Sequence, residues 1–332
     1  MITRIDINKK FYFIKPFIPR NLQLFLRRKL IEHKLSLYKD IWPINEQTNQ
    51  KPERWNGWPD GKKFSLILTH DVELQGGHDK CQALMEMEKQ LGFRSSFNFV
   101  PERYNVSPAL REELIENGFE VCVHGLIHDG KLYSSKKIFM ERAIRINMYL
   151  KEWNSKGFRS PSMHHNLEWI HELNIDFDMS TFDTDPFEPQ SDSAGTIFPF
   201  WVNKNNSTDG YVELPYTLPQ DFSLFILMRE KNNRIWKKKL DWVAEKGGMA
   251  LINVHPDYMN FSKKLNGKEE FPSEFYQDFL EYIKEKYAGE YWHVLPSKMA
   301  SFVKENRSTM QMNTLNLIFD YSKSNNNLIG QV

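Results

Sequence analysis

The chain has 332 residues, with 44 basic and 43 acidic side chains and a formal net charge of +1. This balance gives no general case for a nucleic-acid binder or for a protein that traps acidic substrates. Hydrophobic residues make up 40% of the chain, enough for a sizeable core, and the composition excludes a disordered protein. The two cysteines, Cys81 and Cys122, cannot build a disulfide framework in a chain of this length.

The first 60 residues differ from the rest of the chain. Leucine and isoleucine recur at helical spacing from residue 21 to about residue 38 and predict an amphipathic helix with Asn21 as its N-cap. We expect the apolar face of this helix to pack on the main domain. The alternative is a weak contact of the basic helix, residues 20–35, with a membrane surface. Residues 43–62, rich in Pro, Trp and Gly, predict a linker without regular structure.

The sequence also bears on location. No stretch approaches 18 uninterrupted apolar residues, so a membrane-spanning helix is excluded. The apolar run near residue 12 is too short for a signal peptide and is followed at once by Lys15 and Pro16. We therefore expect a cytoplasmic protein, peripheral at the inner face of the membrane if the basic helix binds lipid.

From residue 64 onward, short apolar strands alternate with helices. The expected strands cover residues 64–69, 95–100, 119–123, 157–159, 178–182, 212–214 and 250–254, and the expected helices cover residues 79–91, 107–117, 137–153, 231–246 and 273–287. This alternation predicts a parallel α/β sheet, closed or open. Residues 184–208 fit the pattern least, and the residues after about 307 predict a polar, frayed tail.

Polar residues gather where the apolar runs end. In parallel α/β folds the active site lies at the carboxyl ends of the strands. The runs here end in residues 69–73, 124–129, 159–161, 183–185 and 255–257. Each member has an ordinary structural explanation when taken alone. The convergence of five strand ends is what predicts a site.

Two of these strand ends indicate a metal site. Asp71 and Glu73 lie two residues apart and point to the same side of an extended chain. Two such carboxylates repel each other unless a cation or a shared proton separates them. His124 and His128 share a face if the backbone turns helically, and such a pair is half of a zinc or iron site. Two histidines and one carboxylate leave open positions for water and substrate.

The remaining strand ends offer acid and orienting groups. His255 follows an apolar run and can donate a proton near neutrality, although a structural role is equally compatible with the sequence. Arg159 could grip a carboxylate in a forked pair. Asp183 and Asp185 could orient a histidine or an arginine, or Asp185 could simply start a turn. The other histidines near this region, His164, His165 and His171, are expected at the surface or in a supporting position rather than as ligands.

This set of residues resembles the polysaccharide deacetylases, the NodB-homology family of carbohydrate esterases, over about residues 61–306. Asp71-Val72-Glu73 is similar to the Asp-Val-Asp motif of one branch, with Glu73 in place of the second aspartate. The resemblance implies that Asp71 is the catalytic base and Glu73 a metal ligand. The His-x-x-x-His motif matches His124 and His128, which implies the other two ligands.

The later family motifs are matched in order. Arg159 and Pro161 match Arg-x-Pro, which implies that Arg159 orients the base. The fourth motif, an aspartate at a strand end, corresponds to Asp183 or Asp185. The fifth corresponds to Leu251 or Asn253 leading to His255, which the family uses as general acid. His70 and Trp201 complete the set expected to support the site or contact substrate.

The resemblance implies an irregular (β/α) barrel with seven repeats, covering residues 61–306. Residues 1–60 form an N-terminal extension with a helix and linker, and residues 307–332 form the tail. The implied activity is the metal-dependent, hydrolytic N-deacetylation of an N-acetylated sugar in a polysaccharide, an oligosaccharide or a lipid- or nucleotide-linked precursor, with zinc as the expected ion.

Two other functions remain open at this point. One is a non-catalytic carbohydrate-binding relative that kept the fold. The other is a metal-dependent phosphohydrolase of the His-Asp kind, suggested by the pairs His70-Asp71 and His128-Asp129. Those enzymes place their ligands on helices, whereas Asp71 follows a strand-like run.

Overall fold

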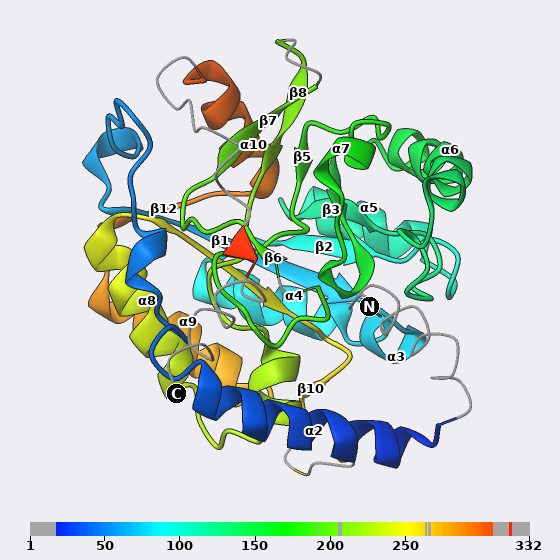
Figure 1. Ribbon diagram of the computed structural model, residues 1–332, viewed down its shortest axis with the longest axis horizontal. Helices are drawn as coiled ribbons and strands as arrows, with labels where there is room; N and C mark the ends of the chain where they lie inside the picture. The colour runs from blue at the N-terminus through cyan, green and yellow to red at the C-terminus, as the bar shows by residue number, and fades with distance from the viewer. Residues whose placement is uncertain are drawn as a thin grey trace, which may run out of the picture.

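A curled sheet of mainly parallel strands forms the centre of the computed structural model (Figure 1). The structure describes residues 18–190, 192–204, 208–262, 264, 267–307 and 319–320. The parallel strands are β1 (Phe64–Val72), β2 (Ser96–Phe99), β3 (Glu120–His124), β4 (Gly157–Arg159), β5 (Phe177–Asp178), β8 (Gly210–Glu213), β9 (Met249–Val254) and β12 (Tyr291–His293). β7 (Phe200–Asn203) pairs antiparallel with β8 at one edge.

The strand order is β12-β1-β2-β3-β4-β5-β8-β7. β12 and β2 pair with the two ends of one edge of β1, and β9 pairs with the opposite edge. β1 is buried at every position, as expected for a parallel strand covered on both faces. This arrangement confirms the predicted α/β fold of the irregular barrel type. It also brings the carboxyl ends of β1, β3, β4 and β9 together, where the candidate residues lie.

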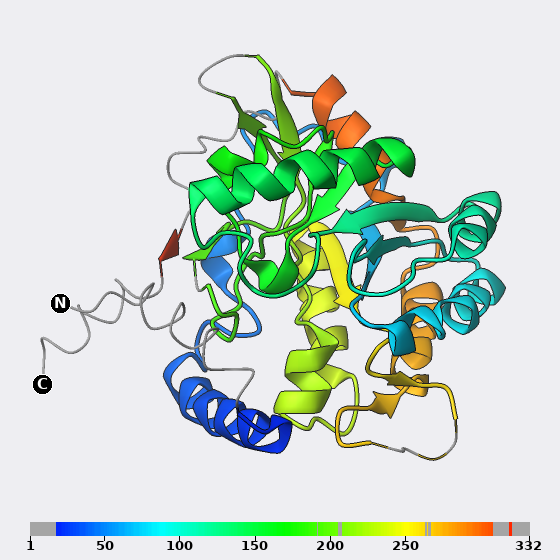
Figure 2. The ribbon, with the colours of Figure 1, turned by 90° about the vertical axis from the view of Figure 1, so that its right-hand side faces the viewer.

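Helices cover the outside of the sheet (Figure 2). They are α4 (Cys81–Leu91), α5 (Pro108–Glu116), α6 (Lys136–Glu152), α8 (Arg234–Lys246), α9 (Glu274–Lys286) and α10 (Pro296–Glu305), with the short helices α3 (Gln75–His78) and α7 (Leu167–Ile170). Ser107 and Ser135 cap α5 and α6 by accepting backbone N–H bonds from the first turn. The apolar faces of these helices pack on the sheet and form one continuous core with it.

Some short elements were not expected. The predicted strand 178–182 is limited to β5, because Ser180 bonds through both its hydroxyl and its amide to the Asp178 carboxylate and competes with the strand ladder. The irregular segment 184–208 contains β6 (Asp192–Ser193) and β7. β13 (Phe319–Asp320), within the predicted tail, pairs with β6. The other tail residues lie outside the described ones. A small sheet joins β10 (Met259–Asn260) and β11 (Phe271–Pro272), and Phe222–Leu227 forms a π-helix, η5.

The N-terminal extension packs on the barrel. Helix α2 (Arg20–Leu37) lies against η5, with Leu24 and Ile31 buried. The predicted cap Asn21 is wrong, because the helix begins at Arg20 and its N-cap residue is Pro19, whose carbonyl accepts the first two backbone bonds. No helix among the described residues combines the length and apolarity needed to cross a membrane.

The expected linker also differs from prediction, since it contains two single 3-10 turns, η2 (Glu46–Thr48) and η3 (Pro59–Gly61). Trp55 and Trp58, between and beside these turns, pack on Phe198 and on Phe302 of α10, with Trp58 stacked on Phe198 and Trp55 edge-on to both rings. Buried aromatic rings contribute large apolar areas, so this segment is held as part of the core.

Candidate metal and catalytic site

Asp71 lies at the end of β1 and is almost completely buried. Its Oδ1 accepts hydrogen bonds from Asn98 Nδ2 at 2.7 Å and from Arg159 Nη1 at 3.2 Å. Its Oδ2 accepts a bond from Asn253 Nδ2 at 2.8 Å. The carboxylate is thus held by donors from three strands, β2, β4 and β9, and Arg159 is one of them.

The charges around Asp71 keep it ionised. Burial by itself would raise the pKa of this carboxyl, but the charges of Arg159 and His255 and the bond from Asn98 hold it well below its usual range. Oδ2 lies 3.9 Å from both His124 Nε2 and His255 Nε2. An ionised carboxylate therefore faces two imidazoles on one side of the site.

Glu73, His124 and His128 form a candidate metal centre, in which one ligand atom from each lies within 4.8 Å of the others. His124 Nδ1 is 3.1 Å from the carbonyl oxygen of Arg159, which places the ring proton on Nδ1 and leaves a lone pair on Nε2. That Nε2 is buried without a hydrogen-bond partner among the described residues. Burial lowers the pKa of His124 to about 4, so the ring is neutral and suited to bind a metal.

Glu73 and His128 complete this centre from two loops. Glu73 Oε1 is 2.9 Å from His128 Nε2, and Glu73 Oε2 accepts a bond from the Tyr258 hydroxyl at 3.3 Å. Burial would raise the pKa of Glu73, but the neighbouring His128 lowers it well below its ordinary value. Asp257 holds the backbone of this loop by accepting bonds from the amides of Glu73 and Leu74. These residues fit a divalent metal with two nitrogen ligands and one oxygen ligand.

The two histidines do not meet through a helical turn. His124 ends β3, Gly125 follows with φ +62°, and His128 has φ +52°. A side chain at position 125 would collide with the ring of Pro161. The helical turn expected between these histidines is therefore wrong. A loop with left-handed residues brings the two rings together instead, with 5.1 Å between their centroids. Pro161 acts here by packing against that loop.

His255 follows β9 and pairs with a carboxylate that the sequence analysis missed. Its Nδ1 is 2.7 Å from Asp221 Oδ1, and its backbone amide donates to Asp221 Oδ2 at 2.7 Å. Burial would lower the pKa of His255, but Asp221 and, more weakly, Glu73 and Asp71 raise it to about 10. The ring is then an imidazolium with a proton on Nε2, which faces Asp71.

The carboxylates expected for the fourth motif lie elsewhere. Asp183 forms a buried ion pair with Lys239 of α8 at 2.6 Å, and Asp185 accepts a bond from the Tyr216 hydroxyl at 2.9 Å. Among the described residues, neither carboxylate bonds to Arg159 or His255. β5 ends at Asp178, and only an isolated bridge between Phe182 and Tyr216 continues the pairing before Asp183. The start of η5 supplies Asp221 instead, from a stretch that carries no recognisable motif.

His70 lies on the other side of β1 from Asp71, as alternation along a strand requires. It is completely buried, 2.9 Å from Glu88 Oε1, which also accepts a bond from Tyr276. Its predicted supporting or substrate role is therefore not what this position provides. The His-Asp phosphohydrolase hypothesis loses its first pair by the same observation.

Asp129, from the second His-Asp pair, forms two bonds to Arg142 at 2.7 and 2.8 Å. Leu251 lies inside β9, where its carbonyl accepts the amides of Thr217 and Leu218. Trp201 of β7 is buried below the guanidinium of Arg307, 5.0 Å from the ring centroid. Among the described residues, none of these three forms a hydrogen bond or an ion pair with Asp71, Glu73 or His255.

The histidine cluster outside the centre is less exposed than expected. His165 is buried and lies 3.4 Å from Asp192, which corrects its expected surface or supporting position. Its pKa is raised, since bonds to Asp192 outweigh the effect of burial. His171 ends α7 and bonds to the carbonyl of Asn203. These residues fasten loops of the barrel.

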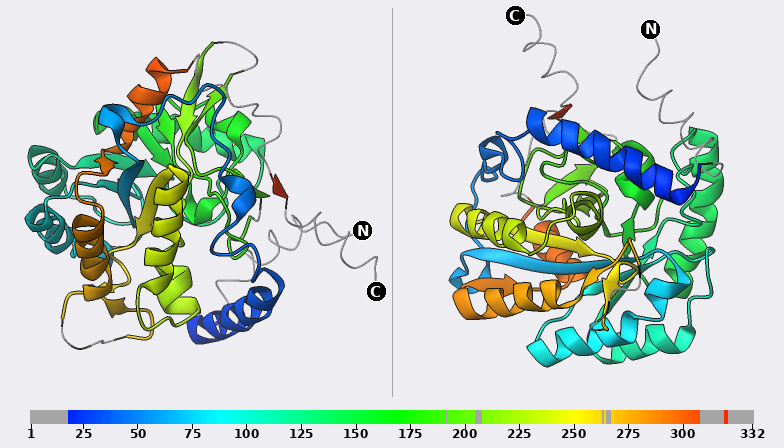
Figure 3. Two further views of the ribbon diagram at one scale, coloured as in Figure 1. Left: turned by 90° about the vertical axis from the view of Figure 1, so that its left-hand side faces the viewer. Right: turned by 90° about the horizontal axis from the view of Figure 1, so that it is seen from below.

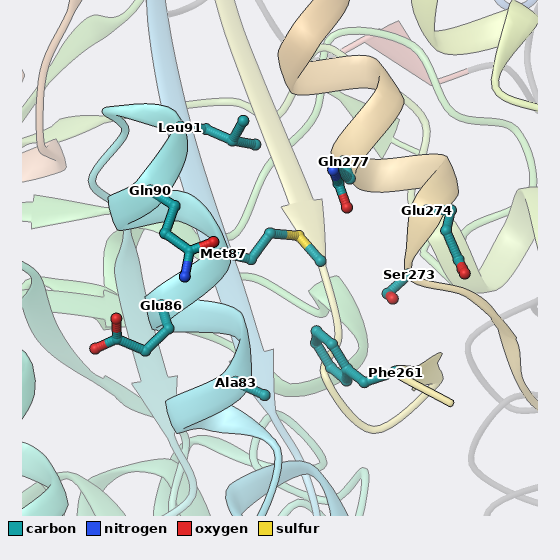
Figure 4. Close-up of a pocket in the computed structure, with 9 residues that line it drawn as sticks. All are labelled: Ala83, Glu86, Met87, Gln90, Leu91, Phe261, Ser273, Glu274 and Gln277. Atoms are coloured by element: carbon teal, nitrogen blue, oxygen red, sulfur yellow. The ribbon is translucent and has the colours of Figure 1, made fainter. Parts of the chain in front are cut away.

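A hollow between α4 and α9 does not belong to this site. Side chains from both helices and Phe261 line it (Figure 4). None of the lining residues is a member of the metal centre or a partner of Asp71 or His255. Its lining carries Glu86, Glu274 and several amides but no cluster that could bind a metal.

Known proteins match this chain in structure and not in sequence. No protein-family model matches the chain, and no curated protein sequence matches it. A Mycobacterium smegmatis protein described as a polysaccharide deacetylase superposes with TM-score 0.59 at 16% identity, over 79% of this chain and 96% of that one. A polysaccharide deacetylase from Pseudomonas aeruginosa PAO1 gives 0.59 at 15% identity, over 80% and 97%.

The Puue allantoinase gives the same TM-score, 0.59, at 14% identity, over 82% of this chain and 99% of that one. The chain therefore has the fold of the polysaccharide deacetylases, as its motifs indicated. Because an allantoinase shares that fold, the substrate has to be argued from the site itself.

Proposed function

We propose that the chain is a metal-dependent N-deacetylase that acts on an N-acetylated sugar in a polysaccharide, an oligosaccharide or a lipid- or nucleotide-linked precursor. One observation carries this proposal. An ionised carboxylate, Asp71, lies between a Glu-His-His centre and the protonated ring of His255. Hydrolysis of an amide needs a base, an acid and a site for charge, and all three meet here.

Glu73, His124 and His128 would hold the metal, with zinc the expected ion for this ligand set. When bound, such an ion lowers the pKa of a water molecule and polarises an amide carbonyl. The neutral state of His124 and the backbone bond to its Nδ1 prepare the free Nε2 for this purpose.

Asp71 would accept the proton of the attacking water. Asn98, Asn253 and Arg159 fix both of its oxygens, so that the carboxylate needs no rearrangement before it acts. The water oxygen forms a bond to the carbonyl carbon as the π bond of the carbonyl opens, and the carbonyl re-forms as the C–N bond of the amide breaks.

His255 would donate its Nε2 proton to the nitrogen as that bond breaks, since an amide anion is a very poor leaving group. Asp221 holds the ring in the required orientation through Nδ1 and stabilises its charge. The products are acetate and the free amino sugar. With every one of these positions filled by a competent group, the non-catalytic alternative is not favoured.

Aromatic side chains beside the centre support a carbohydrate substrate. The ring of Tyr258 packs against that of Phe222, with 4.9 Å between the centroids, and lies 5.3 Å from the ring of His255. Both rings are large enough to cover the apolar face of a sugar. Phe198, Phe200 and Tyr216 are buried in the core and take no part in such a surface.

The test combines metal content with acetate release from a panel of N-acetylated sugars and oligosaccharides. Wild type should bind about one divalent metal per chain, and His124→Ala/His128→Ala should lose it. Asp71→Asn should retain the metal and lose activity by a factor of about 10² to 10⁴. Asp129→Asn is the matched control, because Asp129 bonds to Arg142 outside the centre, and it should keep both properties.

Retained activity in Asp71→Asn would exclude this carboxylate as the base. Loss of metal in the Asp129→Asn control would show that the assay reports folding rather than ligation. Absence of metal in wild type after reconstitution with zinc, iron or cobalt would contradict the assigned centre and return the non-catalytic sugar binder as the better hypothesis.

A further inference from the structure

Helix α2 carries an exposed apolar stripe. Leu22, Phe25, Leu26, Leu30 and Leu37, here called the outer stripe, are between 47% and 55% exposed. Their spacing of three, four and seven residues places them on one side of the helix. Contiguous apolar surface of this kind is uncommon on proteins that stay in water and marks a site of interaction.

The outer stripe is not the surface by which α2 packs on the barrel. Leu24 and Ile31, on the opposite side of the helix, are buried against the core. In Figure 3 the helix runs along the outside of the molecule. The helix is therefore apolar on two sides, and the barrel covers only one of them.

Polar contacts fix how α2 lies on the barrel. Arg28 donates two bonds to the carbonyl of Ile226, and Lys34 donates to the carbonyl of Pro186 at 2.6 Å. Arg20 forms an ion pair with Glu269 at the other end. With both ends and the middle attached, the outer stripe has a set direction relative to the active site.

A short chain of contacts joins α2 to the metal centre. The guanidinium of Arg27 lies 4.8 Å from the centre of the Phe222 ring. Phe222 packs against Tyr258, whose hydroxyl bonds to the candidate ligand Glu73. Helix α2 therefore lies beside the site and not on a remote face of the molecule.

The charge of this region is complementary to an anionic surface. Helix α2 contains five cationic residues, Arg20, Arg27, Arg28, Lys29 and Lys34, and one carboxylate, Glu32. Arg20 and Lys29 are paired with Glu269 and Glu32, whereas Arg28 and Lys34 donate to backbone carbonyls, which carry no negative charge. The 17 residues before position 18 add Arg4, Lys9, Lys10 and Lys15 against Asp6 in sequence. An apolar stripe accompanied by Lys and Arg is the pattern of helices that lie in the plane of a membrane interface.

We propose that α2 binds the surface of an anionic lipid bilayer through the outer stripe, and that the site beside it takes an N-acetylated sugar carried on a membrane lipid. The first half stands on the surface of α2 alone. The second half rests on the proposed deacetylase function.

Vesicle flotation of the full chain tests the first half. Wild type should float with vesicles of phosphatidylcholine and phosphatidylglycerol and much less with phosphatidylcholine alone, and added salt should weaken binding. Leu22→Gln/Leu26→Gln/Leu30→Gln should lower the partition coefficient by about tenfold or more, because three apolar side chains no longer enter the interface.

A matched control lies on α6, where Met140, Ile144 and Met148 form a second exposed stripe at four-residue spacing. Met140→Gln/Ile144→Gln/Met148→Gln removes similar apolar area and should float like wild type. Failure of wild type to float, or equal flotation of the α2 variant, would overturn the proposal. So would a dimer in sedimentation that depends on the outer stripe while vesicles are not bound, since a second copy would then be the occupant.

Acetate release tests the second half, with an N-acetylglucosaminyl dialkylglycerol in anionic vesicles compared with a soluble N-acetylglucosamine oligomer. The α2 variant should lose activity on the lipid and keep activity on the oligomer. Equal activity of variant and wild type on the lipid would overturn the substrate assignment. Flotation without any acetate release would count against the deacetylase function and leave the membrane surface standing.

Discussion

At the scale of single residues, Asp221 decides the charge state of His255. Both of its oxygens are engaged, one by the ring Nδ1 and one by the backbone amide of the same histidine. The carboxylate is completely buried, so its attraction for the imidazolium is weakly screened. This pair keeps the acid protonated in the pH range where Asp71 is an ionised base.

The pH profile of Asp221→Asn tests this assignment. A general acid must be protonated, so activity falls as the pH rises through the pKa of His255, which is raised to about 10. Removal of the Asp221 charge lowers that pKa, and the alkaline limb should move to lower pH. The measurement is the deacetylation rate between pH 6 and 10.5.

Asp278→Asn is the control for this profile, because Asp278 pairs with Lys237 on the outside of the barrel. Its alkaline limb should coincide with that of wild type. An unmoved limb in Asp221→Asn would mean that another group supplies the proton.

Several residues of the site could be predicted because chemistry and position agree in the sequence. Asp71, Arg159 and His255 each follow an apolar run, and the ends of parallel strands meet in space. Asp221 could not be found in this way, since it precedes a π-helix and follows no strand of its own. Asn98 lies inside a strand, where an amide gives no signal until its neighbours are known.

At the scale of elements, the loop after β3 positions the two histidines. Gly125 has φ +62°, and a side chain there would meet the Pro161 ring, which is too stiff to move aside. The loop can therefore place the ring of His128 beside that of His124 only while position 125 is glycine. A four-residue spacing also fits a helix, and for this reason the sequence predicted the pair but not the backbone that brings it together.

Gly125→Ala should accordingly weaken metal binding. We expect a loss of zinc affinity of about 10-fold to 100-fold, comparable to the loss of a supporting contact to a ligand, measured by competition with a chromophoric chelator. Gly92→Ala is a matched control, since Gly92 also has a positive φ, +87°, but no atom lies within 4 Å of the added carbon.

Both variants carry the strain of a left-handed alanine, and only the first carries the collision. Equal affinities in the two variants would show that the loop adapts without moving the histidines. Circular dichroism on both would confirm that the fold is kept.

At the scale of the whole molecule, buried carboxylates set the pH dependence of stability. Burial raises the pKa of Asp183 and of Asp185 to about 6 and that of Glu188 to about 8. A carboxyl whose pKa is raised by folding contributes stability below its unfolded pKa and loses it as the pH rises through the folded value. The contribution of His124 to stability has the opposite sign. Because burial lowers the pKa of this ring to about 4, its contribution grows as the pH rises from about 4 to 6.5.

The metal-free protein should therefore lose thermal stability between pH 6.5 and 8.5. Glu188→Gln removes one of these charges, while its oxygen can still accept the bonds from Tyr216 and Gln220. We expect a shallower fall and a midpoint higher by about 3 °C at pH 8.5. Calorimetry in the presence of a chelator measures this.

Glu32→Gln, at an exposed carboxylate of α2, is the control and should follow the wild-type curve. A steeper fall in Glu188→Gln would show that the carboxylate is stabilised by partners other than those named here.

The alternation of strands and helices was predicted well because parallel strands are covered on both faces and appear as unbroken apolar runs. It failed where elements are very short or antiparallel. β12 has three residues, and β7 is recognised only through its pairing with β8. The packing of the N-terminal segment depends on Trp55 and Trp58 meeting rings far along the chain, which local sequence does not reveal.

β1 is the one strand described here as pairing with three others, with β12 and β2 along one edge and with β9 along the other. Its amide protons should be among the last to exchange with deuterium, since their release needs the whole sheet to open. Asp71 lies on this strand, whereas His128 lies on a loop. As the protein is progressively destabilised, we therefore expect the metal to dissociate before the Asp71 carboxylate that faces it is displaced.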